Sequence, residues 1–554
     1  MKHLIYICSI LFLIPGFVSG QDSTKWEVSG SLRATVDAYW VNGIQARRDP
    51  FNFRLAGNPV VSYGDFRIPM GFVLGNYTSF FNQPYNRFGL SPSYKWITVH
   101  LGYRNLTYSP VTLNGHTFLG AGIDLTPGPL RIGALYGTFQ RSLPFDSLRN
   151  ALVQFPSFQR KGYAAKVGVG SKKNHVDLIL MQMEDEPLSL NYDSLGNVLP
   201  GANTIVGLSS RFQVGKFLEF KGDVGANAFV RDLKAFSFDL PSEAPAYVQL
   251  LDRFLQPNAS IYFTTALKSS LTYRNKATSF SLNYDRIDPD YLSMGSYFFR
   301  NDVESFYLMG RLPLAKRKLR IVSRIGVERN NLRSGLAKTT RRALGFLMLH
   351  YIPSGKWNFN AHYSNFQNRQ IENFRLRSDT SLIVQVSQNA YVGAIRTLRT
   401  ANNIHRISGR VGFRDISDVS GFAGVARNET RTYNAHFRYK ISWRRSGFAL
   451  QPVLTWMQFE NFLNTTEQFR YSLMLQKRFA KNRLSSSLTT TWITTEQTQS
   501  NGTTLNLRGT LSWRITDKQS LMFNTYYLRN QYTGISGIPS FSEWRGTVNV
   551  MWNL

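Results

Sequence analysis

Apolar and polar residues alternate along most of the chain. In residues 26–40 every even position carries an apolar or small side chain, and nearly every odd position carries a polar one. The same alternation returns in residues 432–443, 504–515 and 544–553. Successive side chains of a β-strand point to opposite faces of the sheet, whereas those of a helix repeat about every 3.6 residues. A period of two in segments spread this widely predicts an all-β protein.

The connections between these strands come in two lengths that alternate. Short turns such as 126–129 and 353–356 alternate with longer polar stretches such as 143–159 and 233–258. Short periplasmic turns at one rim and long extracellular loops at the other are typical of a transmembrane antiparallel up-and-down β-barrel. We predict about 24 strands, with a range of roughly 22–26, because one strand with its connection takes up roughly 22 residues.

The chain shows no Pro-, Ser- or Gly-rich linker and no shift in composition that would divide it into domains. We therefore expect residues 21–554 to form a single outer-membrane barrel. One region fits the pattern badly. The stretches 76–94 and 105–116 would both be long connections, whereas one of the two should be a short turn. This irregularity predicts an inward-folded or plug-like segment within residues 76–116.

The N-terminus has the pattern of a secretory signal. Lys2 and His3 precede an apolar run over residues 4–18, and the small residues Ser19 and Gly20 follow it. A basic start, an apolar centre and a small-residue end are typical of a cleaved signal peptide, and the run is shorter than the roughly 20 residues that a spanning helix needs. We predict a signal peptide over residues 1–20 and a mature chain that starts at Gln21.

A membrane location explains the apolar face of the strands. In hydrocarbon every backbone N–H and C=O group must find a partner within the protein, and a closed barrel provides one for each group. Tryptophans lie toward the ends of several predicted strands, as in the aromatic girdles that mark the two membrane interfaces. The alternative, a soluble repeat-built fold, would show a recurring motif of about 40–50 residues, and none is present. The predicted membrane-interface aromatic residues are Trp26, Trp40, Trp357, Trp443, Trp544 and Trp552.

These strands, the Gln21 start and segments such as YKWITVHLGYR at 94–104 resemble bacterial outer-membrane β-barrel proteins, in particular the large porin-like barrels of the Bacteroidota. The resemblance implies a place in the outer membrane of a Gram-negative cell. It also implies contact with outer-membrane lipid and lipopolysaccharide, and insertion by the barrel-assembly machinery. Such proteins usually end on an aromatic residue, whereas this chain ends on Leu554.

The chain is strongly basic, with 65 Lys and Arg residues against 34 Asp and Glu and a net charge of +31. On several predicted strands the basic residues fall on the polar face. An Arg or Lys that faces the centre of a bilayer costs about 2–4 kcal/mol, so these side chains should point into the lumen. The predicted lumen-lining basic residues are Arg320, Arg324, Arg406, Arg410, Arg414, Arg438, Lys440, Arg470, Arg478, Arg508 and Arg514.

A lumen lined by basic side chains concentrates anions and disfavours cations. The leading hypothesis is therefore a porin-like outer-membrane channel that favours the passage or binding of anionic solutes. Two alternatives stay open. Carboxylates from inward loops could pair with the arginines and leave no selectivity, or the barrel could be a non-conducting subunit of an outer-membrane secretion, assembly or adhesion complex. Within the long loop 233–258, the segment 247–254 has helical spacing and could either constrict the lumen or form an outward binding surface.

No catalytic, cofactor or metal site is predicted. The histidines beyond the signal are scattered, with no HExxH spacing, and no GxSxG motif occurs. The acidic groups at 184–186 and 285–290 lack the spacing of a calcium-binding EF-hand loop. The only cysteine, Cys8, lies in the signal, so the exported chain has no thiol. Nucleic acid is not an expected partner, because phosphate binding would not explain export or the sorting of arginines onto one strand face.

Overall fold

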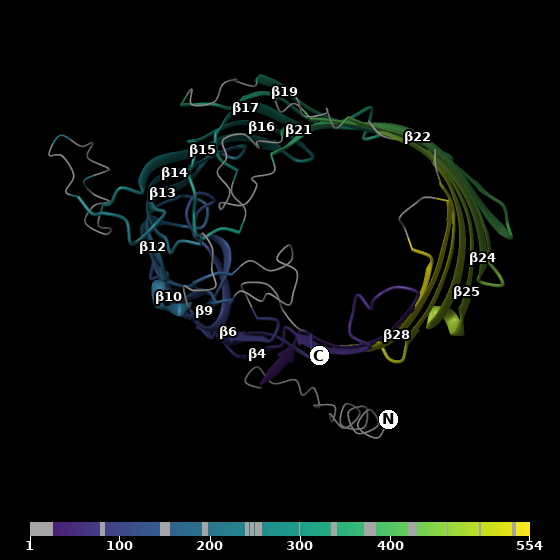
Figure 1. The fold of residues 1–554 in the computed structure, drawn as a ribbon, viewed down its shortest axis with the longest axis horizontal. Coiled ribbons are helices and arrows are strands. Elements are labelled where there is room, and N and C mark those ends of the chain that lie inside the picture. The colour runs from purple at the N-terminus through teal and green to yellow at the C-terminus, as the bar shows by residue number, and fades with distance from the viewer. Residues whose placement is uncertain are drawn as a thin grey trace.

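In the computed structural model the chain folds into one antiparallel sheet that closes on itself (Figure 1). The structure describes residues 26–554 apart from 78–83, 145–155, 191–197, most of 239–256, 298–299, 334–340, 370–383, 419–428, 462–463, 498–499 and 535–538. The predicted signal peptide lies outside the described residues, as does nearly all of segment 247–254.

The described part of the chain is built almost entirely from strands. Neighbouring strands pair antiparallel, as two of them do from Ala202↔Val230 to Val214↔Leu218. The strands are β1 (Glu27–Ser29), β2 (Ser31–Asn42), β3 (Phe51–Gly57), β4 (Val60–Tyr63), β5 (Phe66–Gly75), β6 (Arg87–Leu90), β7 (Ser93–Tyr94), β8 (Ile97–Thr107), β9 (Asn114–Leu125), β10 (Leu130–Gln140), β11 (Gln159–Gly170), β12 (His175–Glu186), β13 (Ala202–Val214), β14 (Leu218–Val230), β15 (Ile261–Asn275), β16 (Thr278–Ile287), β17 (Val303–Leu314), β18 (Leu319–Arg329), β19 (Arg341–Ser354), β20 (Trp357–Arg369), β21 (Val384–Arg399), β22 (Asn403–Asp418), β23 (Thr430–Trp443), β24 (Phe448–Asn461), β25 (Thr465–Phe479), β26 (Leu484–Gln497), β27 (Ser500–Arg514), β28 (Gln519–Gly534) and β29 (Phe541–Asn553). Two short 3-10 helices, η1 (Pro187–Ser189) and η3 (Ala480–Asn482), lie in the connections.

Three strands of the barrel wall are each broken into two segments. Gly30, with a φ of 112°, separates β1 from β2, and this backbone conformation is open to glycine but not to other residues. The pairs β3/β4 and β6/β7 are separated by dipeptides that end in Pro59 and Pro92, and proline cannot donate a hydrogen bond to a neighbouring strand. The 29 described strand segments therefore make a barrel of 26 strands.

The all-β, closed antiparallel barrel predicted from the alternation is confirmed. Its 26 strands exceed the predicted central value of about 24. The central value is low because the broken strands β3/β4 and β6/β7 leave no long alternating run in the sequence. Among the described residues of the irregular region 76–116, β6, β7, β8 and the first residues of β9 belong to the wall, and residues 108–113 leave it between β8 and β9. Residues 78–83 lie outside the described residues.

The barrel closes where the first long strand meets the last. β2 pairs with β29 without interruption, from Ser31↔Asn553 to Asn42↔Ser542. This pairing leaves no free sheet edge, which an open sheet would expose to aggregation. Both ends of the described chain lie at the rim that carries the short turns, such as 276–277 and 315–318. The other rim carries long connections, such as 231–260, but also the short connections 462–464 and 498–499.

A charged network on the inner side of β2 and β29 strengthens this closure. Asp37 is 6% exposed. Its carboxylate accepts hydrogen bonds from Arg545 Nη2 at 3.0 Å, from Thr547 Oγ1 at 2.5 Å and from Tyr77 Oη at 2.5 Å. The three donors come from β29 and from the connection after β5, so one carboxylate holds together three segments at the point of closure.

We expect Asp37→Ala to weaken the closed barrel. The change removes one carboxylate and leaves three donors without their acceptor, and Arg545 is partly exposed, so the expected loss is about 2–3 kcal/mol of unfolding free energy. Urea unfolding followed by tryptophan fluorescence measures this loss. Asp65→Ala, in the exposed turn between β4 and β5, serves as the control and should change the unfolding free energy very little. Equal effects of the two variants would contradict a role in closure.

Candidate functional site

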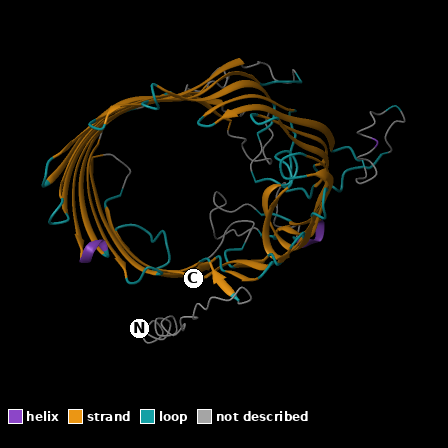
Figure 2. Ribbon diagram, turned by 180° about the vertical axis from the view of Figure 1, so that it is seen from behind, coloured by secondary structure: helices purple, strands orange, loops and turns teal. Residues whose placement is uncertain are grey.

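The pairing register sorts side chains into an inner and an outer face. On β12 and β13, Leu178 and Leu208 are 57% and 44% exposed, whereas Ile179 and Ile205 are fully buried. The buried set lies against chain segments inside the ring, where both views show described connections beside β9–β15 (Figures 1 and 2). The exposed apolar set therefore faces outward. The strand register carries this assignment around the whole barrel.

The predicted basic residues fall on the inner face. On β22, Val411 is 55% exposed and faces outward, so the even-numbered Arg406, Arg410 and Arg414 face the lumen. On the other strands, exposed apolar residues at odd positions, such as Ile325, Phe437, Tyr471 and Trp513, also face outward. The even-numbered basic residues on those strands therefore face the lumen. The inward positions include Arg320, Arg324, Arg438, Lys440, Arg470, Arg478, Arg508 and Arg514.

On the half of the inner wall formed by β9–β18, many of the cations are neutralised by ion pairs. Arg131 Nε lies 2.7 Å from Asp177 Oδ1, and Arg160 Nε lies 2.8 Å from Asp185 Oδ1. Further pairs on the same half are Lys166–Asp124, Arg211–Glu219 and Arg300–Glu328. These cations have fixed partners and contribute little net charge to the lumen.

The opposite half, on β22–β27, carries cations without counter-charges. Among the described residues, none of its predicted lumenal cations has a carboxylate within ion-pair distance. These cations are Arg406, Arg410, Arg414, Arg438, Lys440, Arg470, Arg478, Arg508 and Arg514. All except Lys440 are exposed. Their side chains are therefore not covered by other described residues on the inner face. We call these nine residues the basic wall.

Within the basic wall the cations lie close enough to repel one another. Three guanidinium groups act on the half-buried Lys440 ammonium, those of Arg406, Arg438 and Arg478. His436 is surrounded in the same way by Arg410, Arg438 and Arg470. Like charges held close together, with no carboxylate between them among the residues that the structure describes, create a positive potential.

The hydrogen bonds of His436 show which protonation form the basic wall favours. Arg438 Nη2 lies 3.3 Å from His436 Nε2, and Thr455 Oγ1 lies 2.9 Å from His436 Nδ1. Arginine can only donate, so Nε2 accepts and Nδ1–H donates to the threonine hydroxyl. The imidazole is therefore neutral and adds no charge. Arg410 in turn lies 5.5 Å from the centre of the Tyr391 ring, in cation–π contact.

A second group of basic side chains lies at the lumenal side of the short-turn rim. A hollow of about 520 Å³ there is lined by Arg274, Lys276, Arg311, Arg317 and Arg320. Only Arg320 was among the residues predicted from the sequence. The others stand at strand ends beside turns, where alternation is too short to assign a face, so the sequence pattern alone could not place them.

Two connections fold into the barrel and pack against β9–β15. The Tyr291 hydroxyl donates to the Val111 carbonyl at 2.6 Å, and Ser293 Oγ donates to the Thr112 carbonyl at 2.6 Å. Asn203 Oδ1 on β13 accepts from the backbone N–H of Met294 at 3.0 Å. Burial raises the pKa of the Tyr291 phenol far above its ordinary value, so the hydroxyl stays protonated and keeps its role as donor.

These inward connections rest on an apolar core that lies inside the barrel. Val111, Leu113 and Tyr291 are fully buried against Ile179 and Met181 of β12. The core narrows the lumen on this side and leaves the basic wall opposite it. An apolar core at this place was not predicted from the sequence, since the inner faces of the strands were expected to be polar. The signal was present in the run Leu178–Met181, since a continuous apolar run indicates a strand buried on both faces.

The predicted interface tryptophans all lie on the outer face, at two levels. Trp40 and Trp544 pair directly across β2 and β29 near the rim of long connections. Those near the short-turn rim are Trp26, Trp357, Trp443 and Trp552. Exposure reaches 62% for Trp26 and 61% for Trp40. Two levels of outward aromatic rings are the arrangement that a membrane slab with two interfaces would favour.

The described residues contain no helix with the length and apolar character of a membrane-spanning helix. They also contain no cluster of three or more His, Cys, Asp or Glu side chains that could hold a metal ion.

Comparison with known proteins finds structural likeness without sequence relatives. No protein-family model and no curated protein matches the chain. Among solved structures, the P pilus usher (PapC) translocation pore matches with a TM-score of 0.38 and 11% identity, over 95% of this chain and 99% of that one. The FrpB iron transporter from Neisseria meningitidis matches with a TM-score of 0.36 and 10% identity, over 95% and 81%. OccAB2 from Acinetobacter baumannii gives 0.31 and 11%, over 64% and 92%. The closed barrel follows from the strand register itself and does not depend on these structural matches.

Proposed function

We propose that this chain is a porin-like channel of a bacterial outer membrane whose basic lumen favours the passage or binding of anionic solutes. The observation that carries this proposal is the basic wall, nine inward cations on β22–β27 with no carboxylate partner among the described residues. A closed barrel with an apolar outer face suits a bilayer, because its backbone groups are satisfied within the wall. The short-turn rim is the proposed periplasmic side, because short turns are typical of that side of outer-membrane barrels.

The asymmetry of the lumen supports anion selectivity better than the total charge does. Ion pairs offset many of the cations on the β9–β18 half, whereas none involves the basic wall among the described residues. The β22–β27 half is exposed to lumenal water, and its field is focused by the low-dielectric wall behind it. An anion that crosses the lumen therefore meets an excess of positive charge on this half of the wall. Outer-membrane lipid, lipopolysaccharide and the barrel-assembly machinery are the proposed partners, and no catalytic residue or cofactor is part of the proposal.

A second candidate is a non-conducting barrel within an outer-membrane secretion, assembly or adhesion complex. The inward apolar core favours it, because packed connections occupy part of the lumen. The two candidates differ in whether ions cross the barrel.

The test is the reversal potential of the purified protein in a planar lipid bilayer under a KCl gradient. We expect ion-conducting channels with a reversal potential of the sign set by chloride. A potential of the sign set by potassium would overturn the proposal. Absence of conductance, together with companion proteins in a preparation from native membranes, would overturn it in favour of the second candidate.

A further inference from the structure

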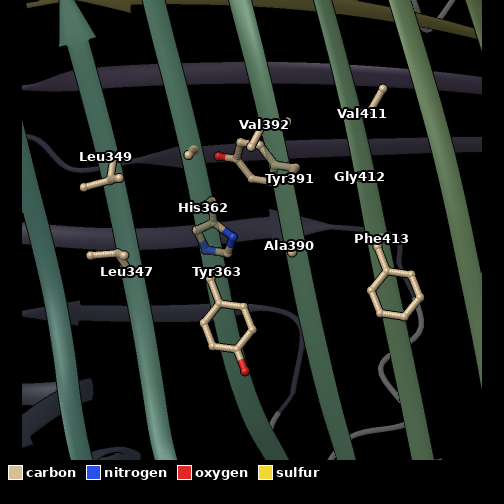
Figure 3. Close-up of a pocket in the computed structure, with 11 residues that line it drawn as sticks. Leu347, Leu349, His362, Tyr363, Ala390, Tyr391, Val392, Val411, Gly412 and Phe413 are labelled. Carbon is tan, nitrogen blue, oxygen red and sulfur yellow. The ribbon is translucent and has the colours of Figure 1, made fainter.

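The outer face of the barrel carries an apolar groove across β19–β25. It consists of two adjoining hollows of about 460 Å³ and 770 Å³, which share Val392 and Val411 as lining residues. Both valines face outward and are more than half exposed, at 56% and 55%. Figure 3 shows the smaller hollow, with the rings of Tyr363 and Phe413 on either side of Ala390. The exposed side chains of the groove therefore lie on the proposed membrane side of the wall.

The groove exists because small residues on neighbouring strands form its floor. Bulky side chains stand around them, and the floor is made of Ala361, Ala390, Ala394, Gly409 and Ala435. A Cβ atom added at Gly409 would meet nothing within 4 Å, so the space above the floor is open. On a surface at hydrocarbon depth such a space must be filled by apolar material.

One end of the groove carries a cation. The Arg396 guanidinium lies 5.2 Å from the centre of the Trp357 ring. Trp357 stacks on Phe359 with ring centres 5.5 Å apart and planes at 7°, and Phe359 lines the larger hollow. Arg396 is exposed and has no carboxylate partner among the described residues. On the next strand, His405 Nδ1 lies 2.8 Å from the Tyr439 hydroxyl, also on the outer face.

The dimensions of the groove fit one leaflet of a bilayer. Arg396 lies three residues before the end of β21 at Arg399, close to the short-turn rim, where an outward cation costs little. Ala390 is six residues further from that rim, about 20 Å along a strand at roughly 3.3 Å per residue. With a strand tilt of about 35–45°, this distance is about 15 Å along the membrane normal. That is half of the roughly 30 Å hydrocarbon core.

We propose that this groove binds an anionic phospholipid of the leaflet next to the short-turn rim. Its phosphate lies on Arg396, and an acyl chain runs over Ala394 and Gly409 toward Ala390. This inference rests on the proposed membrane location but not on anion selectivity. Charge complementarity favours a phospholipid over a second copy of the chain, because a two-fold interface places the same patch on both partners and would bring two Arg396 cations together.

The experiment measures phospholipid binding by native mass spectrometry. Detergent-purified, delipidated protein is titrated with dioleoyl phosphatidylglycerol and, separately, with dioleoyl phosphatidylcholine. We expect phosphatidylglycerol to bind about tenfold more tightly, because its net negative charge is not offset by a choline cation. Arg396→Gln should remove this preference. Gly409→Leu should weaken the binding of both lipids about tenfold, since its side chain fills the floor of the groove.

Matched control variants keep the proposal falsifiable. Lys477→Gln removes another outward cation near the same rim, and Val327→Leu enlarges an outward side chain outside the groove; both should bind lipid as the wild type does. Circular dichroism confirms that each variant is folded. Unchanged lipid binding in Arg396→Gln and Gly409→Leu, or a dimer that Gly409→Leu dissociates, would overturn the inference. We expect the reversal potential of the same variants to equal that of the wild type. The lipid-binding result and the channel result can therefore fail independently of each other.

Discussion

Replacing Arg406, Arg438, Lys440 and Arg478 together by glutamate is expected to turn an anion-preferring channel into a cation-preferring one. These four residues form the group in which three guanidinium groups act on one ammonium, so the substitution reverses the charge of a whole cluster of interacting cations. Charge rings of one sign set the selectivity of wide pores. The expected result is a change in the sign of the reversal potential under a KCl gradient, with the permeability ratio changing about tenfold or more.

The matched control reverses four charges away from the lumenal wall. Lys172 and Lys173 lie in the turn after β11, and Arg444 and Arg445 lie in the turn after β23, all exposed at the short-turn rim. Their replacement by glutamate changes the net charge of the chain by the same amount. We expect a smaller shift of the reversal potential and no change of sign. If the two quadruple variants behave alike, net charge rather than the basic wall governs selectivity.

Tyr291→Ala is expected to release the two inward connections and to widen the lumen. The Tyr291 ring is fully buried in the inward core, and its hydroxyl holds the Val111 carbonyl. Removing a fully buried aromatic ring costs about 3–5 kcal/mol, which is large compared with the few hydrogen bonds that would still hold the two connections together. The expected result is an increase in single-channel conductance, measured in the same planar bilayers, and a lower midpoint of urea unfolding.

Tyr291→Phe separates the role of the ring from that of the hydroxyl. Phenylalanine keeps the apolar contacts and loses only the hydrogen bond, so we expect a loss of about 1 kcal/mol and an unchanged conductance. If Tyr291→Ala lowers stability but leaves the conductance as it is, the inward connections do not limit the passage of ions.

The raised pKa of Tyr291 adds a pH dependence to the same core. In the unfolded chain the phenol loses its proton near its ordinary value of about 10, whereas in the folded protein burial keeps it protonated to a higher pH. The folded state is therefore fully stabilised below about pH 10 and loses this contribution as the pH rises above that value. Unfolding of the wild type, but less so of Tyr291→Phe, should become easier in strongly alkaline urea.

The barrel itself could be predicted from the sequence because the signal is local. An outward Val411 between an inward Arg410 and an inward Gly412 is a pattern that any extended strand produces, and it recurs along nearly every strand. The face of each predicted lumenal cation followed from the same alternation. Where strands are broken, as at Gly30 and Pro59, the local signal is too short, and the strand count from the sequence was low for that reason.

The inward core and the groove could not be predicted in the same way. Tyr291 and Val111 are 180 residues apart in the chain, and no local pattern connects them. The groove needs Ala394 to pair with Gly409 and Val411 to pair with Ala435, and that alignment depends on the register of each strand pair. The run Leu178–Met181 indicated burial on both faces, but not which segment covers the inner one.

The sequence by itself determined that the strands have an apolar and a polar face, and it assigned the basic residues to the polar face. Both follow from neighbouring residues alone, because side chains alternate along any single strand. Only the tertiary structure decided which of those cations are neutralised. Ion pairs such as Arg131–Asp177 form between non-neighbouring strands, and their distances depend on how the barrel closes. Closure also brought distant connections against the β9–β15 side of the wall and left the basic wall uncovered. Such contacts between remote segments form only when the whole sheet is in register.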